Sequence, residues 1–364
     1  MNHPENDEKY KGLKVNSGTS YAPTVSPYLT ARRPRRFTTT EFVEGILRGD
    51  TSILSQAVTL VESSRHEHQQ QAQEIIERCL PHTGHSVRIG ITGVPGAGKS
   101  TSIDVFGMHV LKRGHKLAVL AIDPSSERSK GSILGDKTRM EALAREKNAF
   151  IRPSPTAGSL GGVARKTRET IILCEAAGFD TVFVETVGVG QSETAVHSMV
   201  DFFLLIQLAG TGDELQGIKR GIMEMADGIV INKADGDNIR RAEMAAGHFR
   251  NALHLFPPTE SGWFPKVLTY SGYYGLGIDE VWAMIDEYMA FTKQNGYFDR
   301  KRNRQAKYWM YESIHDMLRD AFYRHPGIEE RLPIVEQQVL HNEISSFVAA
   351  KEMMDIFLKG TTKS

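Results

Sequence analysis

The stretch "VRIGITGVPGAGKS" (87–100) joins a short apolar run to a glycine-rich turn, and a helix-compatible segment follows it. Its second half, "GVPGAGKS" (93–100), fits the pattern G-x-x-x-x-G-K-[ST]. A strand, this loop and a helix in that order form a P-loop, in which backbone N–H groups surround phosphate oxygens. A chance glycine turn is the alternative, but both flanking elements favour the P-loop. We therefore predict a nucleotide-binding domain.

Each part of this loop has a predicted role. The glycines let the backbone approach the phosphates closely. Lys99 is expected to neutralise the β- and γ-phosphates and so to be catalytic, and the Ser100 hydroxyl is expected to hold Mg²⁺. The predicted nucleotide-binding residues in this region are Gly93, Val94, Pro95, Gly96, Ala97, Gly98, Lys99, Ser100 and Thr101.

Short apolar runs alternate with amphipathic segments around the P-loop. Helical segments of about ten or more residues lie between most of these runs, which is typical of an α/β fold with a mostly parallel sheet covered by helices on both faces. The predicted strands are 87–93, 116–123, 149–153, 180–186, 201–208, 227–233 and 265–271.

Four segments are predicted along the chain. Residues 1–36 are polar and form a flexible tail, and residues 37–84 have helical periodicity and form a small helical domain. Residues 85–297 form the P-loop domain, and residues 298–364 are helical and begin with several basic side chains. The arginine-rich end of the first segment is more typical of a solvated tail than of an RNA-binding arm.

Composition excludes several classes of protein. The 364 residues contain 44 Lys plus Arg and 44 Asp plus Glu, so no net charge favours nucleic acid or an anionic membrane. No run of about 18 apolar residues predicts a membrane span, and the polar N-terminus lacks a secretion signal. Cys79 and Cys174 lack metal-ligand spacing, which favours reduced, packed thiols. We expect a cytoplasmic protein that binds neither nucleic acid nor membrane.

The segment "INKAD" (231–235) predicts guanine as the base. In the pattern N-K-x-D at the end of a strand, the Asp235 carboxylate can accept both the N1–H and the exocyclic amine of guanine, whereas adenine lacks that donor pair. Asn232 is expected to brace the loop, and the stem of Lys233 to cover the base. Ser271 and Gly272, in "YSGYYGLG" (270–277), are expected beside the guanine O6.

Three acidic residues are candidates for the metal side. Asp123 ends the strand after the P-loop helix, at the sheet edge where ligands bind. Asp136 lies in a glycine-containing stretch that could cover the γ-phosphate. A turn-forming Asp-Pro and a solvated loop acid are the respective alternatives. Glu185 stands at the end of a strand where nucleotide hydrolases usually carry aspartate, so it indicates a damaged site, an unrelated strand or a distinct class.

Taken together, these motifs resemble the MeaB/ArgK/MMAA family, the methylmalonyl-CoA mutase-associated GTPases of the SIMIBI class of P-loop proteins. The resemblance covers roughly residues 38–297, in order. The segments that carry it are "GILRGDTSILSQAVTLVES", "GVPGAGKST", "AIDPSS", "GSILGDKTRM", "SLGGVARKT", "GFDTVFVETVGVGQSE" and "AGTGDELQGIKRGIMEMADGIVINKAD". One departure is Gly272, where the family often has alanine.

The resemblance implies a role for each remaining candidate. It makes Glu185 the expected metal-side acid and Gly188 a switch near the γ-phosphate, both counted as catalytic with Lys99 and Asp136. Ser100, Asp123, Asp136 and Glu185 would then surround Mg²⁺, directly or through water. It further implies hydrolysis of GTP to GDP, and a chaperone that gates cofactor loading and protection of an adenosylcobalamin-dependent mutase, methylmalonyl-CoA mutase above all. Family members are commonly homodimers through helices that correspond to residues 298–364.

Two other functions are compatible with a P-loop protein of this kind. A transport-linked ATPase or kinase is one, but Asn232 and Asp235 favour guanine over adenine. A metallochaperone GTPase for another metalloenzyme is the second, but such proteins usually carry His-rich tracts or C-x-C-C motifs, which this sequence lacks.

Overall fold

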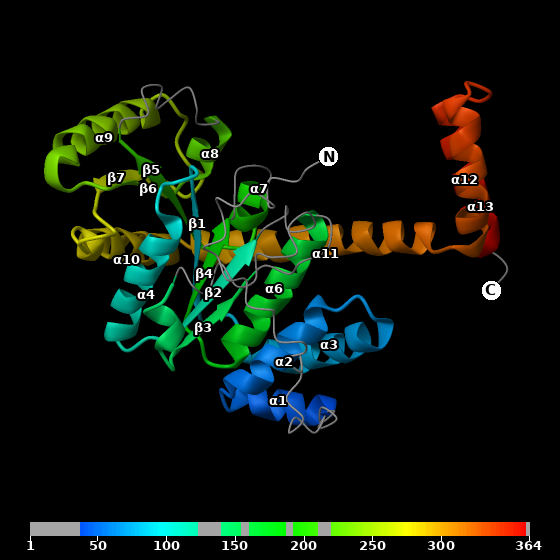
Figure 1. Ribbon diagram of the computed structural model, residues 1–364, viewed down its shortest axis with the longest axis horizontal. Coiled ribbons are helices and arrows are strands. Elements are labelled where there is room, and N and C mark those ends of the chain that lie inside the picture. The colour runs from blue at the N-terminus through cyan, green and yellow to red at the C-terminus, as the bar shows by residue number, and fades with distance from the viewer. Residues whose placement is uncertain (1–36, 123–139, 154–159, 187–191, 210–219, 362–364) are drawn as a thin grey trace, which may run out of the picture. The chain divides into compact units, whose positions relative to one another are not determined.

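A parallel sheet forms the centre of the protein (Figure 1). The computed structural model describes residues 37–122, 140–153, 160–186, 192–209 and 220–361. Within these ranges the sheet has seven strands in the order β3-β2-β4-β1-β5-β6-β7, and every neighbouring pair is parallel. The strands are β1 Val87–Gly93, β2 Leu117–Ile122, β3 Ala149–Arg152, β4 Thr181–Thr186, β5 Phe202–Leu208, β6 Gly228–Asn232 and β7 Lys266–Thr269. Each lies within its predicted run, and the α/β fold is confirmed.

Helices cover the sheet on both faces, which explains why its strands are mostly apolar. One buried cluster includes Phe106 of α4 and Trp282 of α10, and a second includes Phe249 of α9. Close packing also requires a glycine at position 90 of β1, because a Cβ there would lie 2.7 Å from the Phe203 side chain and 2.8 Å from that of Val196. The helices around the sheet are α4 Lys99–Lys112, α6 Leu160–Ala176, α7 Ser192–His197, α8 Arg220–Met225, α9 Ile239–Leu253 and α10 Ile278–Gln294.

Three helices precede the sheet: α1 Thr39–Leu47, α2 Thr51–Glu62 and α3 His66–Cys79. Asp50 caps α2, because its Oδ1 accepts hydrogen bonds from Ser52 N at 2.9 Å and Ile53 N at 3.2 Å. These helices belong to the same compact unit as the α/β layers, which spans Thr39–Ser364. Both cysteines are buried free thiols, and burial raises the pKa of Cys79 to about 11.

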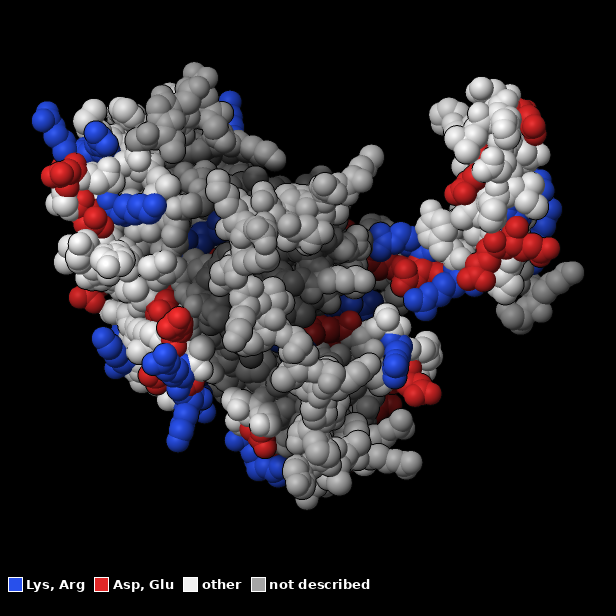
Figure 2. Space-filling model, in the orientation of Figure 1, with Lys and Arg blue, Asp and Glu red and all other residues white. Residues whose placement is uncertain are grey.

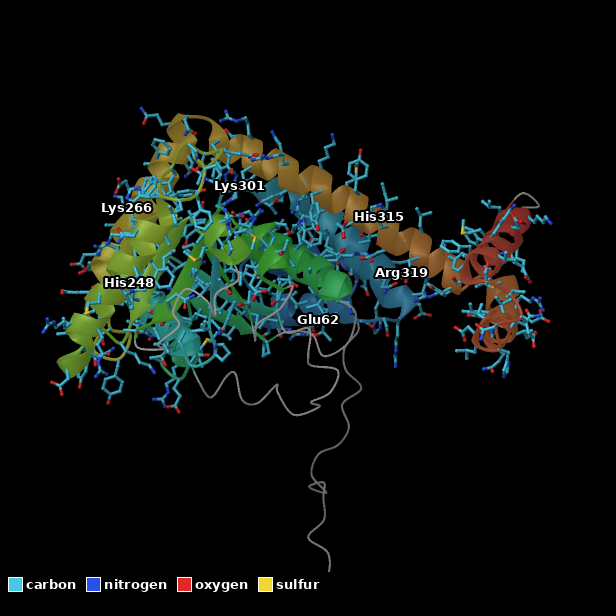
Figure 3. All side chains as sticks on the ribbon, turned by 90° about the horizontal axis from the view of Figure 1, so that it is seen from above. Glu62, His248, Lys266, Lys301, His315 and Arg319 are labelled. Carbon is cyan, nitrogen blue, oxygen red and sulfur yellow. The ribbon has the colours of Figure 1, made fainter. Side chains whose placement is uncertain are left out.

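The C-terminal part consists of α11 Tyr297–Tyr323, α12 Pro326–Leu340 and α13 Ser346–Thr361. Helices α12 and α13 pack on each other around Ile328 and Met353. Figure 3 shows Lys301 near the beginning of α11, with His315 and Arg319 further along the helix. The second half of α11 carries exposed apolar side chains, among them Tyr311, Met317 and Leu318.

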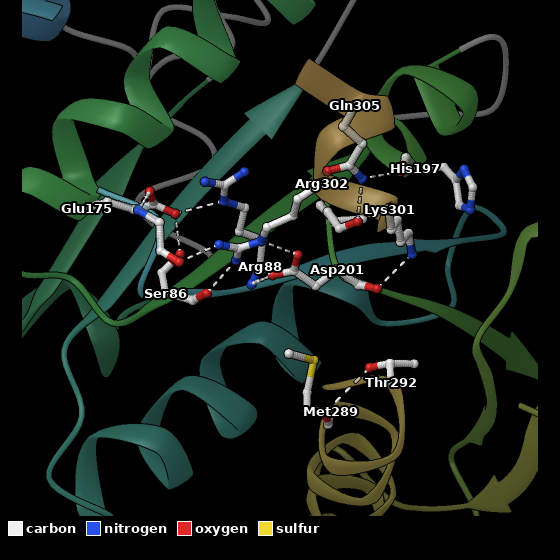
Figure 4. A network of polar contacts seen from close by, with 12 residues as sticks. Ser86, Arg88, Glu175, His197, Asp201, Met289, Thr292, Lys301, Arg302 and Gln305 are labelled. Carbon is white, nitrogen blue, oxygen red and sulfur yellow. Dashed lines mark hydrogen bonds and ion pairs between the residues drawn. The ribbon is translucent and has the colours of Figure 1, made fainter. Parts of the chain in front are cut away.

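The basic beginning of α11 is anchored at the amino edge of the sheet, where the strands begin (Figure 4). Arg302 donates from Nε and Nη2 to the two carboxylate oxygens of Asp201 at 2.8 and 2.7 Å, and Nη2 also donates to Ser86 O at 2.6 Å. Lys301 Nζ donates to Asp201 O at 2.7 Å. Asp201 is 2% exposed. Lys301 and Arg302 therefore hold the beginning of this helix to the sheet rather than being free to bind an anion.

A second acid at this edge, Glu175 of α6, receives three donors. Arg88 Nε donates to it at 2.7 Å, Gly84 N at 2.8 Å, and the Ser86 hydroxyl donates as well. Burial opposes ionisation of Glu175, but the Arg88 charge and these hydrogen bonds outweigh it and lower the pKa of the carboxyl. The acid therefore stays ionised and holds the start of β1 against α6.

No helix in the described ranges is long and apolar enough to cross a membrane. Figure 2 shows Lys and Arg side chains mixed with Asp and Glu side chains among the described residues of one face. The positive and negative side chains, which are equal in number in the composition, are thus also interspersed on this face.

Candidate nucleotide-binding site

The predicted site residues that the structure describes meet at the carboxyl edge of the sheet. Strand β1 lies between β4 and β5; β2 and β3, which follow β1 in the chain, lie beyond β4, whereas β5, β6 and β7 lie on the other side of β1. In an open α/β sheet the loops on either side of such a point diverge and leave a crevice for a ligand. The P-loop follows β1, Glu185 lies near the end of β4, and Asn232 ends β6.

The P-loop backbone has the geometry that its glycines allow. Gly96 and Gly98 have φ of 78° and 83°, values that L side chains rarely adopt. Lys99 Nζ folds back over the loop and donates to Gly93 O at 2.9 Å. Burial lowers the pKa of Lys99, while the carboxylates of Glu185 and Glu193 act in the opposite direction. The loop therefore presents α4's N-terminal backbone groups and a partly buried cation to a phosphate.

Asn232 joins three loops through one side chain. Its Nδ2 donates to Ala97 O in the P-loop at 2.7 Å, and its Oδ1 accepts from Lys233 N at 2.7 Å and Gly272 N at 3.0 Å. The side chain is 3% exposed. Because each of these contacts uses a different loop, Asn232 fixes the phosphate-binding loop relative to the loops predicted to hold the base.

Asp235 lies on the open side of this junction. Its Oδ2 accepts a hydrogen bond from the Ser271 hydroxyl at 2.5 Å, so the two predicted base-side residues touch. Lys233 has a φ of 61°, and Asn238 Nδ2 donates to its carbonyl at 2.7 Å. Asp235 remains partly exposed and Lys233 exposed. A partly exposed carboxylate of this kind can accept hydrogen bonds from a ligand with two adjacent N–H donors.

Comparison with known proteins agrees with this geometry. A family model described as "Methylmalonyl Co-A mutase-associated GTPase MeaB" matches residues 54–326. The chain belongs to the MeaB family. The resemblance predicted from the motifs is therefore confirmed.

Relatives of this MeaB-family protein cover most of its length. A putative GTPase of Caulobacter vibrioides is 52% identical over 312 residues, 86% of this chain and 95% of that protein. The GTPase ArgK of Escherichia coli is 42% identical, with 87% and 96% covered. A Mus musculus protein named methylmalonic aciduria type A homolog, mitochondrial, is 45% identical, with 86% and 78% covered.

A solved structure also resembles this MeaB-family protein. The crystal structure of an LAO/AO transport system kinase has a TM-score of 0.69 and 36% sequence identity, and covers 88% of this chain and 98% of that one. The similarity therefore includes the helices on either side of the P-loop domain as well as the sheet.

The metal side of the site is described only in part. Glu185 is 5% exposed, near the end of β4, in register with Ile91 of β1 and Ala121 of β2. Ser100 is the second residue of α4. Asp123, Asp136 and Gly188 lie outside the described residues. A serine hydroxyl and a glutamate carboxylate are hard oxygen donors, which fit Mg²⁺.

Two contributors were not predicted from the sequence. Tyr270 OH lies 2.5 Å from Ser102 Oγ, which donates to Gly98 O at 2.8 Å, so a buried tyrosine braces the P-loop from beneath. Glu193, at the start of α7, is 2% exposed, and its negative charge acts to raise the pKa of Lys99. For Glu193, the sequence offered one signal of a role in the site, which is its position just after the glycine-rich segment. For Tyr270 the sequence offered no such signal, because its partner Ser102 is 168 residues away.

Proposed function

We propose that this MeaB-family protein binds GTP at the carboxyl edge and hydrolyses it to GDP. The observation that carries the proposal is the Asn232 side chain, which bonds to the P-loop and to the two loops that carry Asp235 and Gly272. A phosphate site and a guanine-type base site held by one buried amide suit a single guanine nucleotide. Asp235 reads the base and Lys233 covers it, and O6 lies beside the loop of Ser271 and Gly272, whose own N–H groups donate to Leu276 O and Asn232 Oδ1.

The chain's own residues supply charge and position for the reaction. Lys99 moves from Gly93 O to the β/γ-phosphate oxygens, where its ammonium stabilises the charge of the transferred group. Ser100 and Glu185 would hold Mg²⁺, together with Asp123 and Asp136, and Gly188 would respond to the γ-phosphate. When bound, Mg²⁺ neutralises charge on the phosphate oxygens. Burial lowers the pKa of Lys99, and the negative charge of Glu193 acts against this effect, which helps to keep the lysine protonated.

We further propose that this GTPase is a chaperone for an adenosylcobalamin-dependent acyl-CoA mutase, with methylmalonyl-CoA mutase as the first candidate. Support comes from the family description and from the name of the mouse relative. A cytoplasmic homodimer is part of the proposal, with α11 to α13 as the contact. Exposed apolar side chains on these helices, such as Tyr311, Met317 and Phe347, suit a surface of that kind.

The chaperone role is tested by measuring GTP turnover with and without the purified mutase of the same organism. A mutase that completes the site should raise turnover at least tenfold. The matched control is the Lys99→Ala variant, whose residual turnover should not respond to the mutase. Equal wild-type rates with and without every adenosylcobalamin-dependent mutase of that organism would exclude the chaperone role and leave the GTPase proposal intact.

A further inference from the structure

Two successive carbonyl groups of the P-loop are linked to the loops predicted to hold the base. Ala97 O accepts a hydrogen bond from Asn232 Nδ2 at 2.7 Å. Gly98 O accepts two hydrogen bonds from Ser102, one from its backbone N at 2.9 Å and one from its hydroxyl at 2.8 Å. The Ser102 hydroxyl in turn lies 2.5 Å from Tyr270 Oη. Asn232 and Tyr270 are therefore two separate links between the phosphate side and the base side of the site.

Tyr270 is held firmly on the base side. Its backbone N donates to Ile231 O at 3.0 Å, and its carbonyl accepts from Ala234 N at 3.0 Å, so its backbone is bonded to the segment "INKAD". Its ring stacks on that of Phe106, with the ring centroids 5.4 Å apart and the planes at 25°. The side chain is 1% exposed. The phenol hydroxyl thus has a fixed position relative to the loop that carries Asp235.

The hydrogen bonds from Tyr270 to the P-loop run in one direction. Ser102 has a single hydroxyl hydrogen, and Gly98 O accepts it. In the contact between the two hydroxyls, Tyr270 must therefore be the donor. Burial raises the pKa of Tyr270, so the phenol keeps the proton that this bond requires. The Tyr270 hydroxyl donates to Ser102 and the Ser102 hydroxyl donates to Gly98 O, and each bond strengthens the other by polarisation.

A carbonyl that is held in this way also fixes an N–H group. A trans peptide unit is planar, so its C=O and N–H point in opposite directions. The Gly98 carbonyl shares its peptide unit with the N–H of Lys99, the first residue of α4. Because the carbonyl points at the buried Ser102 side chain, the Lys99 N–H points away from it, to the side where a helix N-terminus binds phosphate.

We propose that Tyr270 is a positioning residue for the phosphates of the nucleotide, because its hydroxyl acts through Ser102 to hold the peptide unit of Gly98 and Lys99 in the orientation that phosphate binding requires. The inference rests on the proposed binding of GTP, and it gives a base-side residue a role on the phosphate side. Loss of the hydroxyl should weaken phosphate binding and leave base binding unchanged, since the backbone bonds of Tyr270 to "INKAD" remain.

Tyr270→Phe removes the hydroxyl and keeps the ring that stacks on Phe106. Binding of GDP, inorganic pyrophosphate and guanosine to the full-length protein is measured by competition against a fluorescent GDP analogue. The affinities for GDP and for pyrophosphate should each fall about threefold to tenfold, as expected for one buried hydrogen bond. The affinity for guanosine should not change. A loss for guanosine as large as that for pyrophosphate would indicate general loosening of the site and overturn the proposal.

Tyr288→Phe is the matched control. Tyr288 of α10 is also 1% exposed, and its ring contacts Phe202 at the beginning of β5, at the opposite edge of the sheet. This variant should bind all three ligands as the wild type does. If Tyr270→Phe binds GDP as tightly as Tyr288→Phe, the proposal is overturned while the GTP site stands. A wild-type protein that binds neither GDP nor GTP would instead disprove the proposed function, and this inference with it.

Ser102→Ala tests whether the two hydroxyls act in series. Removal of the intermediate hydroxyl should lower the affinity for GDP at least as much as Tyr270→Phe does, because Gly98 O loses one donor outright. Adding Tyr270→Phe to Ser102→Ala should then cause no further loss, since the tyrosine hydroxyl reaches Gly98 O only through this serine. Losses that multiply in the double variant would show that the two hydroxyls act independently, and would overturn the proposal.

Discussion

The two edges of the same sheet use polar residues in opposite ways. At the carboxyl edge, the Asp235 carboxylate accepts a hydrogen bond from the Ser271 hydroxyl and the Lys99 ammonium donates one to Gly93 O, and both groups can form further bonds to a ligand in the crevice. At the amino edge, Asp201 and Glu175 each accept several hydrogen bonds from their own chain. Polar groups at the first edge remain available to a ligand, whereas those at the second are used to hold α11 and α6 in place.

This difference predicts that substitutions at the two edges separate activity from stability. A residue with spare hydrogen-bonding capacity contributes to binding and turnover, while a residue whose capacity is used internally contributes to the free energy of unfolding. Each of the following experiments therefore measures both quantities.

The largest effect is expected from Lys99→Ala. Loss of the cation removes the charge that stabilises the transferred phosphoryl group, so GTP turnover should fall at least about a thousandfold. The free energy of unfolding should change by only about 1 kcal/mol, the value of the hydrogen bond to Gly93 O. Turnover at the wild-type rate in a phosphate-release assay would disprove the role of the P-loop lysine.

At the amino edge, Asp201→Ala should have the reverse signature. The substitution leaves the largely buried Arg302 guanidinium without its carboxylate partner and Arg88 N without its acceptor, so the free energy of unfolding should fall by about 3–5 kcal/mol. Turnover per folded molecule should stay within about twofold of the wild type. Urea unfolding and an assay on the folded fraction measure the two quantities.

The control for this variant is Asp286→Ala. Asp286 pairs with Arg113 at 3.0 Å, but both side chains are about half exposed, at 53% and 42%. Such a pair contributes less than about 1 kcal/mol. A loss in Asp201→Ala no larger than the control's would show that the amino-edge network does not stabilise the fold.

The sequence revealed the carboxyl edge far better than the amino edge, for a physical reason. Phosphate and base binding depend on several residues within one loop, so "GVPGAGKS" and "INKAD" are local patterns, and the strands that carry them were predicted to within two residues. The ion pair of Asp201 and Arg302 joins single charges 101 positions apart. No local pattern distinguishes these from solvated charges, and the basic start of α11 gave no sign of its burial.

A third prediction concerns base recognition at the carboxyl edge. In Asp235→Asn the side chain loses one acceptor and gains a donor, so it suits xanthine better than guanine. The preference for GTP over XTP should fall by about a hundredfold in a competition assay, with little change in stability. Asp237→Asn is the matched control, because Asp237 is an exposed acid two residues away. An unchanged preference in Asp235→Asn would remove this residue from base recognition.

The smallest effects distinguish two glycines that both face Asn232. At Gly98 a Cβ would lie 2.7 Å from Asn232 Nδ2, and the φ of 83° disfavours any side chain. Gly98→Ala should therefore cost about 1–2 kcal/mol and weaken GTP binding, because the contact of Asn232 with Ala97 O is disturbed.

At Gly272 the nearest atoms to a Cβ are Asn232 Oδ1 and Ser102 Oγ, each at 3.4 Å, an ordinary contact distance. Gly272→Ala should thus be neutral or stabilise the protein by up to about 1 kcal/mol through the unfolded chain, with GTP affinity unchanged. Urea unfolding and nucleotide titration of both variants decide the matter. If Gly272→Ala weakens GTP binding as much as Gly98→Ala does, the packing around Asn232 is tighter than these distances indicate, and the amide's three contacts depend on both glycines.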